Sequence, residues 1–310
     1  MALFPRPILT DGATHSAQQF RMLVRDLARG AEGITQGTDL KVTQLGTPGT
    51  SVQVSDGSGV VRGRVNTFQG TYSVCNIGAT NVAIAATGGS PRSDMVILRV
   101  EDPEYEGVIN PASGEVAYFD VISNVSSSAT TIPDGRTGIP LARIDIPAST
   151  STITNAYIKD IRTIANPRRE RRVWTQAVTT TSTELGASTT YAYFSTAAGW
   201  NIPIPTWAST ATIIVTGSSL KLNANPFYGG FRAAFGASLT VQNVTIDDQG
   251  SGTRRTQTVA ADTLTIPDAY RGTTQLLRAQ AAAYSGNTGR ISVDASSTLI
   301  ADVEFTEAPR

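Results

Sequence analysis

Residues 91–100 read PRSDMVILRV, and this stretch indicates a β fold. The turn-forming residues GGSPRSD run directly into Met95–Val100, an apolar block typical of a strand that is buried on both faces. Arg92 and Asp94 stand where the loop meets this strand. An Asp accepts hydrogen bonds from nearby backbone donors, and an Arg offers a fork of donors. We therefore expect an ion pair or a backbone cap here and assign both residues a structural role.

Short segments with a period of two residues lie on both sides of this stretch. In SVQVSDGSGVVRGRV (51–65), alternating valines surround the turn signal Asp56-Gly57, a pattern that favours a hairpin. The other strand candidates are 40–43, 114–122, 139–147, 209–217, 236–247, 262–268, 290–296 and 297–305. One face of the last candidate carries only apolar residues, namely Leu299, Ala301, Val303 and Phe305. Strands at this spacing indicate a β-sandwich or a jelly roll.

One segment, HSAQQFRMLVRDLARG (15–30), has helical periodicity instead. Its apolar residues recur at i, i+3, i+4, i+7 and i+8: Phe20, Leu23, Val24, Leu27 and Ala28. Ser16 and Gln19 form a capping-box pattern at its start, so we expect the helix to begin there. An amphipathic helix usually packs its apolar stripe on its own domain. The predicted fold class is therefore all-β with one N-terminal amphipathic helix.

The segment NPRRERRVW (166–174) interrupts the strand pattern with a proline and four arginines. We place a domain boundary here. The prediction is an N-terminal domain at 1–166, a basic linker at 167–173 and a C-terminal domain at 174–310. Both domains are expected to be β-sandwich-like, and the C-terminal one jelly-roll-like. An anion-binding role for the arginines is less expected than a solvated linker or ion pairs to a partner subunit.

Composition limits the classes of partner and of chemistry. The chain has 25 basic and 25 acidic residues, so no global field favours nucleic acid or an anionic membrane. It has one histidine, His15, and one cysteine, Cys75, which is too few ligands for a zinc site. We expect Cys75 to be a buried, inert thiol on a strand. No catalytic residues, metal or cofactor are predicted.

Two features leave other functions open. The acidic stretch EDPEYEG (101–107) holds several carboxylates, and glycoside hydrolysis needs two that face each other across a sugar. A solvated acidic loop is the favoured interpretation. In the second half, Trp200, Phe227 and Tyr228 offer rings for stacking on sugars, and Asn225 offers a donor and an acceptor. The Gly229-Gly230 pair would leave room for a ligand. These residues form the candidate glycan site.

Three phrases resemble one family in the order in which they occur. They are TDGATHSAQQFRMLVRDL (10–27), SPRSDMVILRVED (90–102) and IPLARIDIPASTSTITNAYIKDIR (139–162). They resemble minor tail or baseplate fibre proteins of siphophages that infect actinobacteria. AAGWNIPIPTWAS (197–209), YRGTTQ (270–275) and STLIADVEF (297–305) look like the C-terminal half of such a protein. The shared motifs are structural rather than catalytic.

This resemblance implies a non-enzymatic protein of a phage tail tip that is assembled in the host cytoplasm. The N-terminal domain would dock onto other tail or baseplate proteins, and the C-terminal domain would face outward toward a host cell-surface glycan. A homo-oligomer is expected, with a trimer favoured from analogy with fibres. No nucleic acid partner and no membrane insertion are expected. The alternatives are a glycan-cleaving tail enzyme with a carboxylate pair and a non-viral carbohydrate-binding module.

Overall fold

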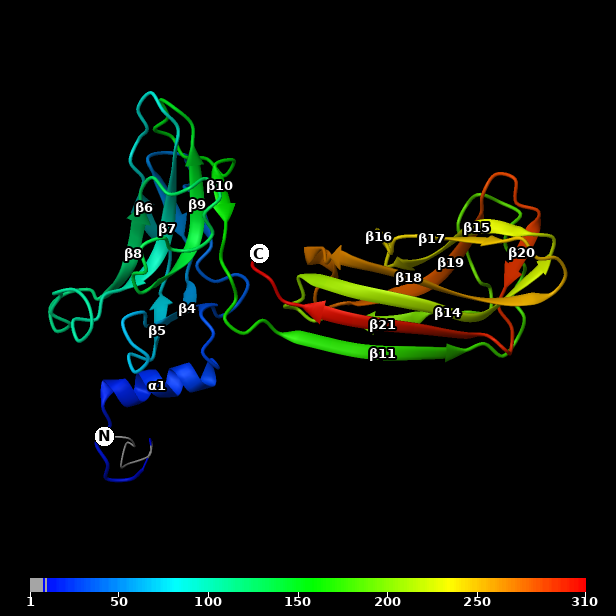
Figure 1. Cartoon of the computed structure of the whole chain (residues 1–310), viewed down its shortest axis with the longest axis horizontal. Coiled ribbons are helices and arrows are strands. Elements are labelled where there is room, and N and C mark those ends of the chain that lie inside the picture. Colours follow the sequence, from blue (N-terminus) through cyan, green and yellow to red (C-terminus); the bar gives the residue numbers. More distant parts are fainter. Residues whose placement is uncertain (1–7, 9) are drawn as a thin grey trace. The chain divides into compact units, whose positions relative to one another are not determined.

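The computed structural model describes residue 8 and residues 10–310. The described chain is built from antiparallel β-strands and contains one α-helix, near the N-terminus (Figure 1). The predicted fold class is therefore confirmed. The chain divides into two compact units, Met1–Pro167 together with Ala308–Arg310, and Arg168–Glu307. It thus passes between the units twice, between Pro167 and Arg168 and again between Glu307 and Ala308.

The first unit combines helix α1 (Ala17–Leu27) with three small antiparallel sheets. One sheet has the order β1-β4-β5, the second β2-β3-β6 and the third β10-β9-β7-β8. The strand bounds are β1 Gly33–Ile34, β2 Val42–Gln44, β3 Ser51–Val54, β4 Gly57–Arg62, β5 Thr71–Asn76, β6 Thr80–Ala83, β7 Arg92–Val100, β8 Ala117–Ile122, β9 Gly138–Ile146 and β10 Ile158–Asp160. One apolar core, with side chains from all three sheets, holds them together.

Strand β7 lies in the middle of the third sheet, between β8 and β9. Its residues from Ser93 to Leu98 are all buried, as the unbroken apolar block predicts for a strand covered on both faces. Burying a large apolar side chain contributes about 1.5–3 kcal/mol to the free energy of unfolding relative to leaving it in water. The stretch 91–100, most of which forms β7, is therefore part of the core of the first unit.

Helix α1 begins with the predicted capping box: Ser16 caps Gln19, and Gln19 reaches back to Ser16. Its orientation differs in part from our expectation. The apolar residues Phe20 and Leu27 are 47% and 73% exposed, whereas Gln19 and Arg21 are buried. Periodicity shows which residues share a face, but not which face meets the body of the unit. The packing prediction was wrong for Phe20 and Leu27, whereas Val24 and Ala28 of the same stripe join a small apolar cluster.

The second unit is a β-sandwich of two antiparallel sheets. One sheet has the order β11-β21-β14-β18, with β20 also paired to β14, and the other has the order β12-β19-β15-β16. Strand β13 also pairs with β19, and β17 with β15. The bounds are β11 Arg169–Ala177, β12 Ala192–Tyr193, β13 Trp200–Pro203, β14 Thr210–Ala224, β15 Phe227–Phe235, β16 Leu239–Thr240, β17 Val244–Asp248, β18 Arg254–Thr265, β19 Thr274–Ala283, β20 Gly289–Ser292 and β21 Thr298–Thr306.

The strand order of this unit is that of a jelly roll. Strands β12 and β13 occupy one position beside β19, and β16 and β17 occupy one position beside β15. With β20 set aside as an addition, successive strand positions alternate between the sheets, except that β15 is followed by β16 and β17 in its own sheet. Each sheet interleaves early and late strands. Two sheets wound in this way form a double Greek key. The predicted jelly-roll-like C-terminal fold is therefore present.

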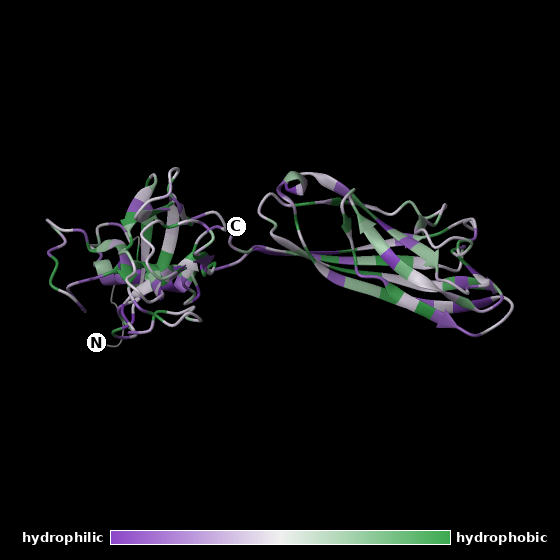
Figure 2. Ribbon diagram, turned by 90° about the horizontal axis from the view of Figure 1, so that it is seen from above, coloured by the Kyte–Doolittle hydropathy of each residue, from purple (hydrophilic) through white to green (hydrophobic). Residues whose placement is uncertain are grey.

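The core of the second unit lies between the two sheets. Strand β21 alternates buried and half-buried residues along its whole length, and its buried face consists of the predicted Leu299, Ala301, Val303 and Phe305. Figure 2 shows hydrophobic and hydrophilic residues alternating along the strands of this unit. The period of two was therefore sufficient to predict which side of this strand faces inward.

Two sequence interpretations need correction. Residues 169–173 are not a linker, because they belong to β11, which pairs with β21 along its whole length from Arg169 to Ala177. Arginines can be accommodated on β11 because it is an edge strand, and one backbone edge and one face of an edge strand remain in contact with water. Cys75 lies on a strand, β5, as expected, but its side chain is exposed rather than buried, with the Ser58 hydroxyl 3.1 Å from its Sγ.

Candidate functional site

Two of the four predicted glycan-binding residues belong to the core of the second unit. Phe227 is 0% exposed and Trp200 is 6% exposed. Phe227 is the first residue of β15 and points between the sheets, and Trp200 on β13 also packs in this core. A buried ring cannot stack on a sugar in solvent, so these two assignments were wrong. Large aromatic residues are used here to fill the sandwich.

The other two predicted residues are exposed, but they lie in different settings. Asn225 stands in the short turn between β14 and β15, and its carbonyl accepts a hydrogen bond from Arg254. Tyr228 is 40% exposed and lies on β15. The Gly229-Gly230 pair leaves no room for a ligand. A Cβ on Gly230 would lie 2.1 Å from the Tyr191 hydroxyl, so the space is filled by this chain's own side chains.

Tyr228 belongs to a larger surface on the outer face of the β12-β19-β15 sheet. Residues that pair across these strands share a face, and Phe231, Ala279 and Ala281 point into the core. The alternate positions therefore face outward. They bring together four tyrosines and two arginines, which we call the tyrosine–arginine face: Tyr191, Tyr193, Tyr228, Tyr284, Arg232 and Arg278.

Arg232 occupies the middle of this face. Its guanidinium carbon lies 3.8 Å from the centre of the Tyr191 ring, and its Nε donates to Oε1 of Gln280 at 2.9 Å. Among the described residues its terminal nitrogens have no partner. Arg278 lies 4.5 Å from the centre of the Tyr193 ring and holds the carbonyls of Ala197 and Phe194. Arginine on a tyrosine ring is a favourable cation–π arrangement.

The tyrosines are held in fixed positions. The rings of Tyr228 and Tyr284 meet edge to face with centroids 5.2 Å apart, and the Tyr284 hydroxyl accepts from Asn243 at 2.8 Å. Burial, together with the neighbouring Tyr284 hydroxyl, raises the pKa of Tyr191 to about 12. The Tyr191 ring is therefore neutral at physiological pH. The buried Tyr191 hydroxyl makes no hydrogen bond of good geometry.

The tyrosine–arginine face suits a ligand such as a sugar, which has polar groups at its edge and flat apolar sides. Tyr193 and Tyr228 are each 40% exposed, and an exposed ring can cover the apolar side of a sugar. The free guanidinium nitrogens of Arg232 can donate to hydroxyl, carboxylate or phosphate oxygens. The sequence interpretation found only Tyr228, because the other residues come from strands far apart in the chain. The alternation in YAYF (191–194) was the available signal for Tyr191 and Tyr193.

Arg92 and Asp94 form a fork-to-fork ion pair at the start of β7. Nε and Nη2 of Arg92 donate to the two carboxylate oxygens of Asp94 at 2.8 Å each. The backbone N–H of Asn124 donates to the same carboxylate at 3.0 Å. Asp94 is 0% exposed, so both the ion pair and the backbone contact satisfy a buried charge. These contacts join the first residues of β7 to the segment after β8.

The acidic stretch after β7 is neutralised by cations of the same unit. Arg21 donates to Glu104 at 2.7 Å and lies 3.3 Å from Asp102. Burial and the bond to Asp102 raise the pKa of Tyr72, whose hydroxyl donates to that carboxylate at 2.8 Å. Glu101 accepts from the Tyr118 hydroxyl at 2.6 Å. These carboxylates are structural ion-pair partners, which gives no support to a glycoside hydrolase pair.

The arginines of segment 168–172 also pair within their own unit. Arg168 holds Glu307 through two side-chain bonds of 2.9 and 2.7 Å, and Arg171 pairs with Asp302. Arg172 lies 2.7 Å from Glu170. These arginines therefore form ion pairs within the chain, and ion pairs to a partner subunit stay a prediction. Among the described residues, no cluster of three or more His, Cys, Asp or Glu could hold a metal ion, and no helix is long and apolar enough to cross a membrane.

Comparisons with known proteins give only distant structural similarity. No protein-family model matches the sequence, and no curated protein matches it either. The structure of infectious bursal disease virus, Gx strain, is 12% identical over 90% of this chain and 84% of that chain, with a TM-score of 0.23. The VP2 subviral particle of the same virus is 12% identical, covers 90% and 79%, and has a TM-score of 0.25. TM-scores this low do not establish a common fold.

Proposed function

We propose that this chain is a non-enzymatic structural protein of a phage virion, at the tail tip, whose second unit attaches to a glycan on the host cell surface. The tyrosine–arginine face is the observation that carries the attachment role. It presents two exposed rings and an arginine with free donors on a rigid sheet. The sequence resemblance to minor tail and baseplate proteins supports the location in the virion.

The jelly-roll topology agrees with this role by analogy. Jelly rolls occur in viral capsid proteins and in lectins, but a fold alone does not fix a function. The specific support comes from the face, since the exposed Tyr193 and Tyr228 rings come from different strands of one sheet. Arg232 lies beside them and keeps its terminal nitrogens free of partners among the described residues. One copy of such a surface would bind a glycan weakly, and several copies of the chain together would bind it more tightly.

The first unit would dock onto other tail or baseplate proteins. Its helix presents Phe20 and Leu27 to solvent, and the nearby loop presents Phe68, which is 65% exposed. The side-chain amide of Gln18 donates to the Phe68 carbonyl at 3.0 Å, so helix and loop share one surface. Exposed apolar groups that gather on one surface are typical of protein contacts. A homo-oligomer, with a trimer favoured, is part of the same proposal.

A binding experiment tests the attachment role. The full chain is displayed in many copies on beads and incubated with actinobacterial cell walls and with a glycan array. A Tyr193→Ala, Tyr228→Ala double variant should bind at least about tenfold more weakly, which corresponds to about 1.4 kcal/mol. Val259→Ala is the matched control, because Val259 is 45% exposed but lies on β18 in the other sheet. The control should bind like the parent.

Two results would contradict the proposed attachment. If the double variant and the parent bind cell walls equally, the tyrosine–arginine face is not the site. If neither the parent nor the double variant binds any glycan, and the double variant keeps the parent's unfolding temperature, the attachment role is wrong. Only the structural role then remains. A change in the Val259→Ala control would show that the assay reports general surface adhesion.

A further inference from the structure

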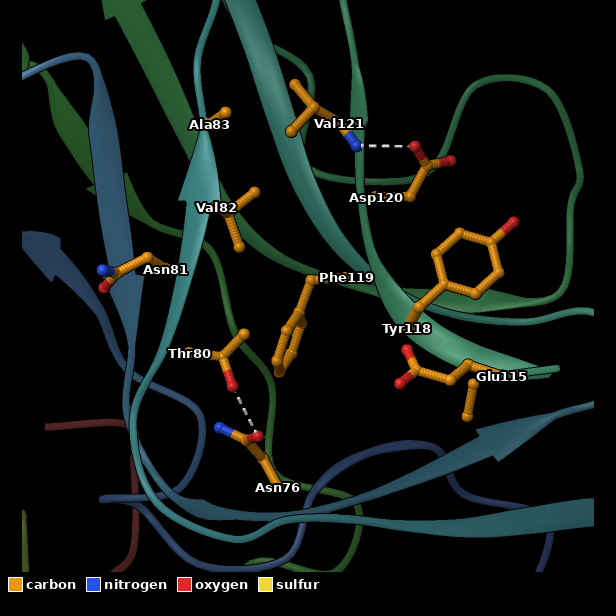
Figure 3. A pocket seen from close by; sticks show the side chains of 11 residues that line it. Asn76, Thr80, Asn81, Val82, Ala83, Glu115, Tyr118, Phe119, Asp120 and Val121 are labelled. Atoms are coloured by element: carbon orange, nitrogen blue, oxygen red, sulfur yellow. Dashed lines mark hydrogen bonds between the residues drawn. The ribbon is translucent and has the colours of Figure 1, made fainter.

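A groove of about 780 Å³ lies in the first unit between strands β6 and β8. Both are the last strands of their sheets, β6 beside β3 and β8 beside β7. Figure 3 shows the side chains of Val82 and Phe119 reaching into the space between the two strands. Edge strands present unpaired backbone groups, and proteins usually cover or blunt them. Here two such edges line one groove.

The register of β8 shows which of its backbone groups face the groove. The N–H of Glu101 donates to the carbonyl of Val116 at 2.7 Å, so these two residues form a hydrogen-bonded pair. Because such pairs alternate in an antiparallel ladder, the next pair, Val100 with Ala117, is not hydrogen-bonded. The N–H and C=O groups of Ala117, and of Phe119 two residues later, therefore point away from β7 and have no partner in the described chain.

The same reasoning applies to β6. The N–H of Ile84 donates to the carbonyl of Thr50 at 2.8 Å, so the adjacent pair, Ala83 with Ser51, is not hydrogen-bonded. The backbone of Ala83 therefore also points away from its only neighbouring strand. Open backbone donors and acceptors thus stand on both walls of the groove.

Side chains define the kind of segment that fits. On the inner side, Phe119 and Val121 of β8 and Val82 of β6 pack against the core and offer an apolar floor. The lining residues include two acids, Glu115 and Asp120, and no Lys or Arg. Asp120 already pairs with Arg136 at 2.8 Å and accepts from the Val121 N–H, also at 2.8 Å. Glu115 is exposed and is the acid left for an incoming positive charge.

We propose that this groove binds an extended segment of a partner protein, which adds to β8 as a further antiparallel or parallel strand. The segment alternates apolar residues, which cover Phe119 and Val82, with polar residues that include a Lys or Arg facing Glu115. Backbone hydrogen bonds to Ala117 and Phe119 supply affinity, and the alternating side chains supply specificity. This is the β-strand addition mode of peptide recognition.

A single extended segment fits the groove better than a second copy of this chain. The most basic edge strand of the chain is β11, but it belongs to a sheet, and its Arg171 and Arg172 are already paired with Asp302 and Glu170. A strand with a sheet attached would meet the opposite wall formed by β6. A flexible segment has no such attachment and can enter between the two walls.

The test uses the full chain and a synthetic peptide, acetyl-KVKVTVKV-amide, which alternates apolar and basic residues. Binding is measured by calorimetry with the parent protein and with Ala117→Pro. Proline at the first residue of an edge strand removes one N–H donor with little other effect. We expect binding to weaken at least about tenfold. Ala117→Val keeps the N–H donor, is the matched control and should bind like the parent.

Two peptide controls do not depend on how a protein variant folds. The same peptide with alternate backbone nitrogens methylated cannot form the ladder and should not bind the parent. A peptide with Glu in place of each Lys should bind more weakly, because Glu115 would repel it.

Three outcomes would overturn the proposal. One is equal binding of the methylated and the unmodified peptide, which would show attraction by charge alone. Another is no binding of the unmodified peptide to the parent. The third is self-association of the parent without peptide that Ala117→Pro abolishes, which would make a second copy the occupant.

Discussion

At the scale of single residues, the first unit uses one device three times on neighbouring strands. Arg92 pairs with Asp94 on β7, and Arg143 pairs with Asp145 on β9 at 2.8 Å. Arg162 pairs with Asp160 at the end of β10 at 2.6 Å, with the arginine side chain 0% exposed. Residues two apart on a strand share a face. Each Arg-x-Asp or Asp-x-Arg pair therefore forms an ion pair without any long-range packing.

The Arg92–Asp94 pair should respond asymmetrically to substitution. Arg92→Ala leaves the buried Asp94 carboxylate with the Asn124 N–H as its remaining partner, so we expect a loss of about 3–5 kcal/mol in unfolding free energy. Asp94→Ala leaves Arg92, whose side chain is 23% exposed, in contact with water, so its cost should be smaller. Urea unfolding measures both. Arg25→Ala, which breaks an exposed pair with Asp26, is the control and should change little.

Equal stability of Arg92→Ala and the parent would contradict this account. It would mean that the Asp94 charge is satisfied by other groups or relaxes into solvent when the arginine is lost.

At the scale of elements, helix α1 is anchored by a buried arginine as well as by the Val24 and Ala28 end of its apolar stripe. Nε of Arg21 donates to the Gln69 carbonyl at 2.8 Å, and the guanidinium carbon lies 5.5 and 5.2 Å from the Tyr72 and Tyr105 ring centres. Gly70, with φ +79, permits this approach, since a Cβ there would lie 2.8 Å from the Arg21 backbone. The anchor therefore depends on contacts from two other chain segments, 69–72 and 102–105.

Substitutions on the two faces of α1 should distinguish the buried face, which anchors the helix, from the exposed face. Arg21→Ala removes the partner of Asp102 and Glu104, so we expect a loss of about 2 kcal/mol or more. Leu27→Ala changes a side chain that is 73% exposed, so its effect should stay within about 0.5 kcal/mol. Thermal unfolding of the full chain measures both. A larger loss for Leu27→Ala than for Arg21→Ala would show that the apolar stripe is the packed face.

At the scale of the whole molecule, the chain has two apolar cores that share no residue. The first unit also includes the last three residues, Ala308–Arg310. The N–H of Arg310 donates to the Gly37 carbonyl at 2.8 Å, and Arg162 donates to the Arg310 carbonyl at 3.0 Å. No pattern in the sequence signals this return of the chain.

Separate cores predict two unfolding transitions in calorimetry. Phe231→Ala in the second core should lower one transition by the equivalent of about 3–5 kcal/mol, and Leu141→Ala in the first core should lower the other by about 2–5 kcal/mol. Both side chains are 0% exposed. Each variant should leave the other transition unchanged. A single transition that both variants shift equally would show that the units unfold together.

The sequence by itself determined the local features of this protein. The period of two in β21, the apolar block of β7 and the capping box of α1 depend on neighbours within a few residues, so they can be read from the chain. Ion pairs two residues apart, such as Arg92 with Asp94, belong to the same class. The all-β fold follows from the sum of these signals, as does the jelly-roll expectation from strand spacing.

Only the tertiary structure decided which faces are covered and which surfaces come together. Phe227 and Tyr228 are neighbours with the same candidate chemistry, yet one fills the core and the other faces water, because the second sheet covers one side of β15. The buried face of α1 was decided by Asp102 and Glu104, which lie more than eighty residues from Arg21. The tyrosine–arginine face and the groove beside β8 arise from pairing between distant strands, and such long-range contacts leave no local pattern in the sequence.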